Sequence, residues 1–154
     1  MEPWMLILLV PLAVVLAIAA WRGMRTFGGR VAIERARELF KLQRERLEVQ
    51  FMTPAAATGK PRGLLWKDCQ WDNPVEFVRE VGTGQIHALV GVTIAFEAVP
   101  GGDMEGLPAV GNLRNASAVF AFQNGHWRTQ GKAVFNMNPD ETIRHFQGQY
   151  ERIV

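Results

Sequence analysis

One uncharged run at the start of the chain, WMLILLVPLAVVLAIAAW from Trp4 to Trp21, limits what this sequence can fold into. A helix of that length spans about 26 Å, close to the thickness of a bilayer's hydrocarbon core. Only a helix lets a single segment cross lipid with its backbone groups paired. Both tryptophans stand where aromatic rings favour the membrane interface, and Arg22 and Arg25 follow directly. We therefore predict a single-pass transmembrane anchor over residues 1–22, with these four side chains at the interface.

A cleaved secretory signal peptide is the alternative interpretation of this run. Its apolar core would end near Ala17-Ile18-Ala19, which resembles a cleavage site between small residues. Against cleavage, no Lys or Arg precedes the run, whereas positive residues follow it. The positive-inside rule then places the carboxyl-terminal domain in the cytoplasm. A domain outside the membrane would instead favour the interpretation as a cleaved signal.

Charge is distributed unevenly along the chain. Residues 1–62 hold ten Lys or Arg against five Asp or Glu, and residues 63–154 hold seven against ten. Basic residues beside an anionic leaflet are attracted to it, which favours a membrane-proximal role for the first half. The second half has no basic stripe with interleaved aromatics, so no nucleic-acid partner is predicted. The single cysteine, Cys69, excludes an intrachain disulfide and is typical of a small buried apolar residue.

A charged helix is expected to follow a flexible basic collar at residues 23–30, which is rich in glycine. The helix would run from about Arg30 to Met52 and end in a proline-containing linker at residues 53–62. Its apolar stripe is expected to pack on the domain's own sheet. A homodimeric coiled coil is the alternative, although Gln43 interrupts the stripe. The stripe consists of Ile33, Ala36, Leu39, Phe40, Leu47 and Phe51.

From residue 63 onward the apolar pattern changes to a period of two, which is typical of strands. Asn124-Gly125 fits a tight hairpin turn, because both residues tolerate positive φ. Asn138 is suited to cap a closing helix that would run to about Tyr150. Five strands are predicted, at residues 63–71, 75–81, 85–99, 112–123 and 126–136.

Together these elements predict one α+β domain over residues 31–154. A long amphipathic helix would pack on a curled antiparallel sheet of four to five strands, and a short helix would close the chain. This element order resembles the cystatin-like and nuclear-transport-factor-like architectures. Three runs, GVTIAFEAV (91–99), VGNLRNASAVF (110–120) and GKAVFNMNP (131–139), are similar to a group of uncharacterised bacterial single-pass membrane-anchored proteins. The resemblance implies the architecture and the anchor, but no activity.

Reactive groups are sparse in this sequence. The histidines lack neighbours at metal-ligand spacing, and no phosphate-binding loop is present, so no metal and no cofactor is predicted. His87 and His126 are both expected on the outer face of the sheet. If their strands were adjacent, they would share a groove with Glu97 and Arg128, which is the only candidate ligand site.

A loop at residues 100–111 is the candidate contact for a protein partner, although a solvated connection explains it equally well. Its exposed tip would carry Asp103, Met104, Glu105 and Leu107.

Three functions remain open from the sequence. The leading hypothesis is a membrane-tethered, non-catalytic interaction or accessory domain. The second is a small-ligand-binding or enzymatic domain with a pocket between sheet and helix, near Trp66, Trp71, Trp127 and His87. The third is a self-associating envelope scaffold that uses the long helix.

Overall fold

The computed structural model describes residues 3–58 and 62–154, with side chains described at positions 11, 13–20, 29–58 and 62–154. The chain divides into two compact units, one that ends at Arg35 and one that covers Ala36–Val154. Helix α1 (Pro3–Thr58) belongs to both. Within the described residues, no helix is long and apolar enough to cross a membrane. The side chains of Trp4, Trp21, Arg22 and Arg25 lie outside the described residues.

The predicted flexible collar is wrong, because residues 22–30 are helical. A glycine inside a helix costs about 1 kcal/mol relative to alanine. The collar is therefore part of the continuous helix α1.

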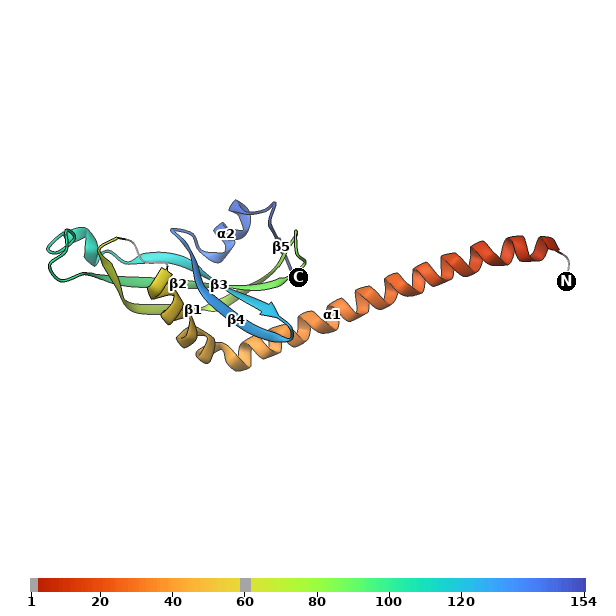
Figure 1. Ribbon diagram of the computed structural model, residues 1–154, viewed down its shortest axis with the longest axis horizontal. Helices are drawn as coiled ribbons and strands as arrows, with labels where there is room; N and C mark the ends of the chain where they lie inside the picture. Colours follow the sequence, from red (N-terminus) through yellow and green to blue (C-terminus); the bar gives the residue numbers. More distant parts are fainter. Residues whose placement is uncertain (1–2, 59–61) are drawn as a thin grey trace. The chain divides into compact units, whose positions relative to one another are not determined.

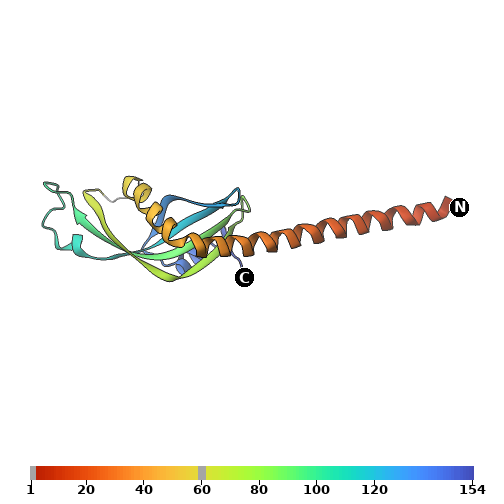
Figure 2. The ribbon, with the colours of Figure 1, turned by 90° about the horizontal axis from the view of Figure 1, so that it is seen from below.

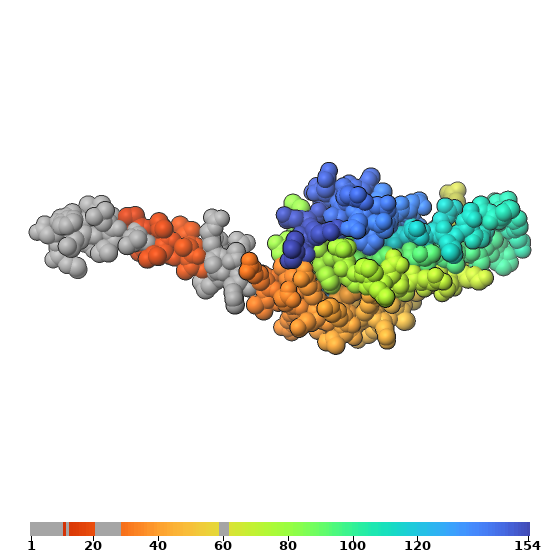
Figure 3. All heavy atoms as spheres, turned by 180° about the vertical axis from the view of Figure 1, so that it is seen from behind, coloured from red at the N-terminus to blue at the C-terminus, as the bar shows by residue number. Residues whose placement is uncertain are grey.

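The second unit is an α+β domain built on a curled, five-stranded antiparallel sheet, as predicted (Figure 1). Residues 36–58 of α1 cover one face of the sheet, called here the inner face. Helix α2 covers part of the other, outer face (Figures 1 and 3). The strand order is β4-β3-β2-β1-β5. The elements are β1 (Leu64–Glu80), β2 (Ile86–Ala98), η1 (Pro108–Gly111), β3 (Arg114–Gln123), β4 (His126–Phe135), α2 (Pro139–His145) and β5 (Tyr150–Arg152).

The main core lies between α1 and the inner face, which the helix crosses obliquely (Figure 2). Phe40 is fully buried, with its ring centroid 5.5 Å from that of Phe120 and 5.0 Å from that of Trp127. The indole Nε1 of Trp127 donates a hydrogen bond of 2.8 Å to the carbonyl of Ala36. The predicted packing of the helix stripe on the sheet is therefore confirmed. Its buried members are Ala36, Phe40, Leu47 and Phe51, and Ala55 continues the stripe.

Helix α1 does not end at the predicted linker but continues through Pro54 to Thr58. Proline removes one helical hydrogen bond, which usually ends a helix. Here Ala55 is fully buried against β4, where Gly131 has a φ of +71°. A Cβ on that glycine would lie 2.2 Å from the backbone nitrogen of Ala55. This close packing, together with the helix preference of the alanines after Pro54, keeps the segment helical.

The two strands predicted at residues 63–71 and 75–81 are one strand, β1. Asp72, Asn73 and Pro74 interrupt its pairing with β2 without ending the strand. Arg44 on α1 donates hydrogen bonds to the carbonyls of Asp72 and Asn73, and its Nε pairs with Glu48 at 2.7 Å. The irregularity is thus tied to the helix, and the ladder resumes at Val75.

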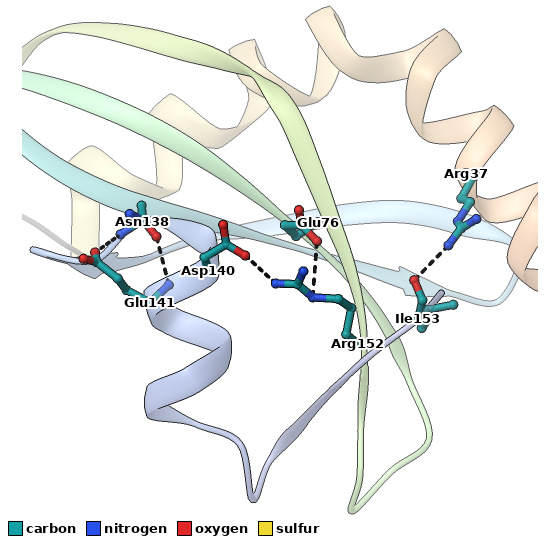
Figure 4. A network of polar contacts seen from close by, with 7 residues as sticks. All are labelled: Arg37, Glu76, Asn138, Asp140, Glu141, Arg152 and Ile153. Atoms are coloured by element: carbon teal, nitrogen blue, oxygen red, sulfur yellow. Dashed lines mark hydrogen bonds and ion pairs between the residues drawn. The ribbon is translucent and has the colours of Figure 1, made fainter.

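The strands predicted at 85–99, 112–123 and 126–136 are confirmed as β2, β3 and β4, with ends that differ by at most two residues. Asn124 and Gly125 both have positive φ, as the hairpin turn requires. Asn138 caps α2 in a reciprocal capping box with Glu141 (Figure 4). The helix, however, ends at His145 and not at Tyr150. Tyr150 instead pairs with Glu80 in a short fifth strand.

Helix α2 is held on the outer face by buried hydroxyls and by surface charges. The Thr142 hydroxyl donates to Ser117 at 2.9 Å, and Ser117 donates to the Met137 carbonyl at 3.0 Å. Arg152 on β5 binds Asp140 of α2 and lies 3.6 Å from Glu76 of β1 (Figure 4). These contacts hold α2 against β1 and against β5, the edge strand that pairs with β1.

Candidate functional site

A row of directly opposed residues crosses the outer face at one end of the sheet. His87 on β2 pairs with Ala121 on β3, and Ala121 pairs with Arg128 on β4. Residues opposite each other in a ladder point to the same face, so the three side chains share one surface. On the far side of β2, His87 is opposite Val78 of β1.

A pocket of about 400 Å³ lies over this row. Its volume is within the range of about 300–1,000 Å³ that is typical of small-molecule sites. Each of the five strands contributes to its lining. The principal lining residues are Glu80 of β1, His87 of β2, Ala121 of β3, Arg128 and Lys132 of β4, and Tyr150 of β5.

His87 is deeply buried in this pocket, with 8% of its surface exposed. Neither ring nitrogen has a hydrogen-bond partner in the part of the chain that the structure describes. Its Nε2 lies 3.9 Å from Oε2 of Glu80, which is too long for a hydrogen bond. Burial lowers the pKa of His87 below 6.5, against the opposing charge of Glu80 and with a smaller contribution from Lys132. The imidazole is therefore neutral at pH 7 and offers one donor and one acceptor.

Glu80 and Tyr150 form the wall beside His87. The Tyr150 ring centroid lies 5.8 Å from that of His87. Burial raises the pKa of Tyr150, and the nearby Glu80 charge raises it further. The Thr83 hydroxyl donates to Oε2 of Glu80 at 2.5 Å, which fixes the carboxylate at the end of β1. This wall presents an anchored negative charge next to the neutral imidazole.

The opposite wall is basic. Arg128 and Lys132 are exposed on β4, and the amide side chain of Gln130 lies between them in sequence. Neither cation forms an ion pair with an acidic residue among residues 29–58 and 62–154. The site therefore has a basic wall, a neutral floor and an acidic wall.

Of the four candidates predicted from sequence, the structure brings two together, His87 and Arg128. Strand β3 lies between their strands, so the adjacency of β2 and β4 on which the shared groove depended is not found. Glu97 is on β2 but ten residues from His87, a separation of about 33 Å along a strand. His126 is exposed at the hairpin turn and lines a separate hollow between α1 and β4.

Sequence reasoning missed Glu80, Lys132 and Tyr150. Tyr150 was expected on a helix, and its pairing with β1 involves residues about 70 positions apart, a contact that periodicity does not reveal. Glu80 carries a weaker signal, because it directly precedes the Val81-Gly82-Thr83-Gly84 turn that returns the chain to His87.

The predicted partner loop has an irregular path that ends in η1. Asp103 and Glu105 are exposed, and Leu107 is 47% exposed, whereas Met104 packs against Gly63. Trp66, Trp71 and Trp127 pack in the main core, and Trp127 also lines the hollow of about 550 Å³ between α1 and β4, on the side of the sheet where a pocket is predicted. Burial raises the pKa of Cys69 to about 11, which keeps this thiol protonated.

No cluster of three or more metal-ligating side chains occurs in residues 3–58 and 62–154. Comparisons with protein-family models, with curated proteins and with solved structures gave no match to this chain.

Proposed function

We propose that this chain is a membrane-tethered, non-catalytic accessory protein whose domain, residues 36–154, binds a small polar ligand in the pocket around His87. One observation carries the proposal. A histidine that is more than nine-tenths buried faces a pocket of ligand size, and neither of its ring nitrogens is paired within the described residues.

An unpaired buried polar group is costly, about 1–3 kcal/mol. Native proteins pair nearly all such groups with protein or bound water. If position 87 had no functional role, an apolar residue there would make the protein more stable. Leu89, two residues further along the same face, is such a residue. A ligand that pairs with the imidazole would explain why histidine stands at this position.

Binding is favoured over catalysis by the arrangement of the charges. Glu80 is held by Thr83 and lies 3.9 Å from the imidazole. The cations stand on the other wall, with the neutral floor between. Groups spaced across a pocket in this way suit recognition of a ligand's ends.

The membrane part of the proposal rests on residues 4–21 of the sequence, which carry no charge and are followed by arginines. The positive-inside rule favours a cytoplasmic domain. To test this, Cys69→Ser would be combined with Asp103→Cys, which places one thiol on the exposed loop. Labelling by a membrane-impermeant reagent only after cells are opened is expected, and labelling in intact cells would contradict this orientation.

The ligand proposal is tested with the full chain in mild detergent. A thermal-shift screen of small polar metabolites is expected to give compounds that raise the melting temperature. Ala121→Phe puts a ring on the pocket floor and should abolish the shift. Gln70→Phe is the matched control, because Gln70 is exposed on the same face of the sheet, opposite Thr93 and away from the pocket.

Two results would contradict ligand binding in this pocket. One is a screen in which no compound stabilises the full chain. The other is a compound that stabilises the Ala121→Phe variant as strongly as the unaltered protein, because it would bind elsewhere.

A further inference from the structure

We infer that the ligand of the His87 pocket is a small dipolar molecule, with an anionic group that binds Arg128 and Lys132 and a cationic group that binds Glu80. This inference rests on the proposed function and names the chemical class of the ligand. It follows from the placement of charges around the pocket, from the groups between them and from the cost of alternative ligands.

The strand order separates the charges of the two walls. Arg128 and Lys132 are on β4, Glu80 is on β1, and β3 and β2 lie between. Three strand spacings of about 4.8 Å put the two backbones roughly 14 Å apart. Long side chains on both walls reduce that distance, so a ligand of a few carbon atoms can reach both.

Both walls remain available to a ligand. Arg128 and Lys132 are exposed and form no ion pair within the described residues. Glu80 accepts a hydrogen bond from Thr83 through Oε2. Its other carboxylate oxygen, Oε1, is not used in that bond and can accept a hydrogen bond from an ammonium group.

The floor between the walls is polar but neutral. The titratable groups around His87 are Glu80, Lys132 and Tyr150, and burial keeps the imidazole uncharged at pH 7. A neutral imidazole neither repels a cation nor attracts an anion strongly. It offers a donor and an acceptor to the middle of the ligand. The walls therefore decide which charges the ligand carries.

Ligands of a single charge fit this pocket less well. A simple anion bound to Arg128 and Lys132 would leave Glu80 unpaired at the far wall. A simple cation bound to Glu80 would leave Lys132 in the same position. A dipolar ligand pairs with both walls, and each charge would disfavour the wrong end of the ligand.

The test measures binding of defined probes to the full chain in detergent by isothermal titration calorimetry. The probes are 4-aminobutanoate and 6-aminohexanoate, which carry both charges, with butanoate, hexanoate, butylamine and hexylamine as single-charge partners. We expect at least one amino acid to bind tenfold or more tightly than its two single-charge partners. Ala121→Phe should abolish this binding.

Charge-removing variants assign each end of the probe. Glu80→Gln should weaken the preferred amino acid about tenfold and leave the carboxylate probe unaffected. Lys132→Gln should weaken both the amino acid and the carboxylate and leave the amine unaffected. Matched controls are Glu97→Gln and Lys67→Gln, which remove exposed charges outside the pocket, and neither should change any of these affinities.

The outcomes separate this inference from the proposed function. If the metabolite screen yields a pocket ligand that carries one charge or none, the dipolar inference fails and the proposed function stands. The inference also fails if the amino acids bind no more tightly than their single-charge partners, or if Glu80→Gln has no more effect than Glu97→Gln. If no compound binds the pocket at all, both fail.

Discussion

The two faces of the sheet are formed by the same strands but are covered by different helices. Strand β2 shows the contrast, because Ala88, Val90 and Val92 point into the inner core whereas His87 points into the outer pocket. On the inner face, α1 lies across the sheet and aromatic rings fill most of the space between them, apart from the hollow beside Trp127. On the outer face, α2 is a helix of seven residues and covers only part of the surface. A short cover leaves a hollow, and polar residues can line it.

The difference concerns the cover rather than the strands. The outer face has its own apolar cluster, in which Val78, Leu89, Val119, Ile143 and Tyr150 are buried. This cluster reaches only as far as α2 and β5 extend. His87 lies next to it, at the boundary between the covered and uncovered parts, and Tyr150 belongs to both cluster and pocket. The larger core thus lies on the inner face, and the pocket proposed to bind a ligand lies on the outer face.

The largest loss of stability is expected from a substitution in the core of the inner face. Phe40→Ala removes a fully buried ring that contacts Phe77, Phe120 and Trp127, and should lower the free energy of unfolding by about 3–5 kcal/mol. Urea unfolding of the full chain in mild detergent, followed by tryptophan fluorescence, measures this loss. Val119→Ala on the outer face is the comparison, with an expected loss of about 1–2 kcal/mol. Equal losses would contradict the assignment of stability to the inner face.

A second prediction concerns the contact of α1 with β4. Gly131→Ala should destabilise the domain by about 3 kcal/mol, because its φ is +71° and its Cβ would collide with the backbone of Ala55. Gly125→Ala is the matched control, with a φ of +77° and no atom within 4 Å of the added Cβ. Gly125→Ala should lower the free energy of unfolding by only about 1 kcal/mol, through the strain of an alanine at positive φ in the turn. If the two variants lose the same stability in urea, the close approach of helix and strand is wrong.

The smallest expected effect is the pH dependence of stability that comes from His87 on the outer face. The folded pKa of His87 is lowered, so the unfolded chain takes up its proton first as the pH falls below 6.5. Stability should therefore be lost as the pH falls below 6.5, with a slope of at most about 1.4 kcal/mol per pH unit. Above pH 6.5 His87 is neutral in both states, so its effect on the pH dependence should vanish. His87→Gln should show a shallower slope just below pH 6.5. Parallel slopes would mean that the buried imidazole does not titrate as described.

Local patterns predicted much of this fold. The alternation in residues 85–99, the Asn124-Gly125 turn and the capping residue Asn138 depend on neighbours within a few positions, and the structure confirms all three. The errors have another cause. Pro54 stays in α1, where Ala55 packs on Gly131, and residues 72–74 stay in β1, where Arg44 of α1 binds the carbonyls of Asp72 and Asn73. In both places a contact distant in sequence overrides the local signal.

The candidate site was predicted only in part for a related reason. His87 and Arg128 could be placed on the outer face by alternation alone. Which residues join them depends on the strand order, and Tyr150 enters only because β5 pairs with β1. Alternation also gives no measure of depth, so the burial of His87 was not foreseen. That burial depends on the Tyr150 ring beside it.

The irregularity at residues 72–74 also affects how the domain behaves in a crowded solution. Strand β5 pairs with β1 only at residues 78–80. Most of the edge of β1 that faces away from β2 therefore has no neighbouring strand within the described residues. Such an edge is a template on which copies of a protein can aggregate. Pro74 lacks an amide donor, and Arg44 already occupies the carbonyls of Asp72 and Asn73. An incoming strand would lose its register at the middle of β1, so we expect this irregularity to disfavour edge-to-edge pairing of two copies.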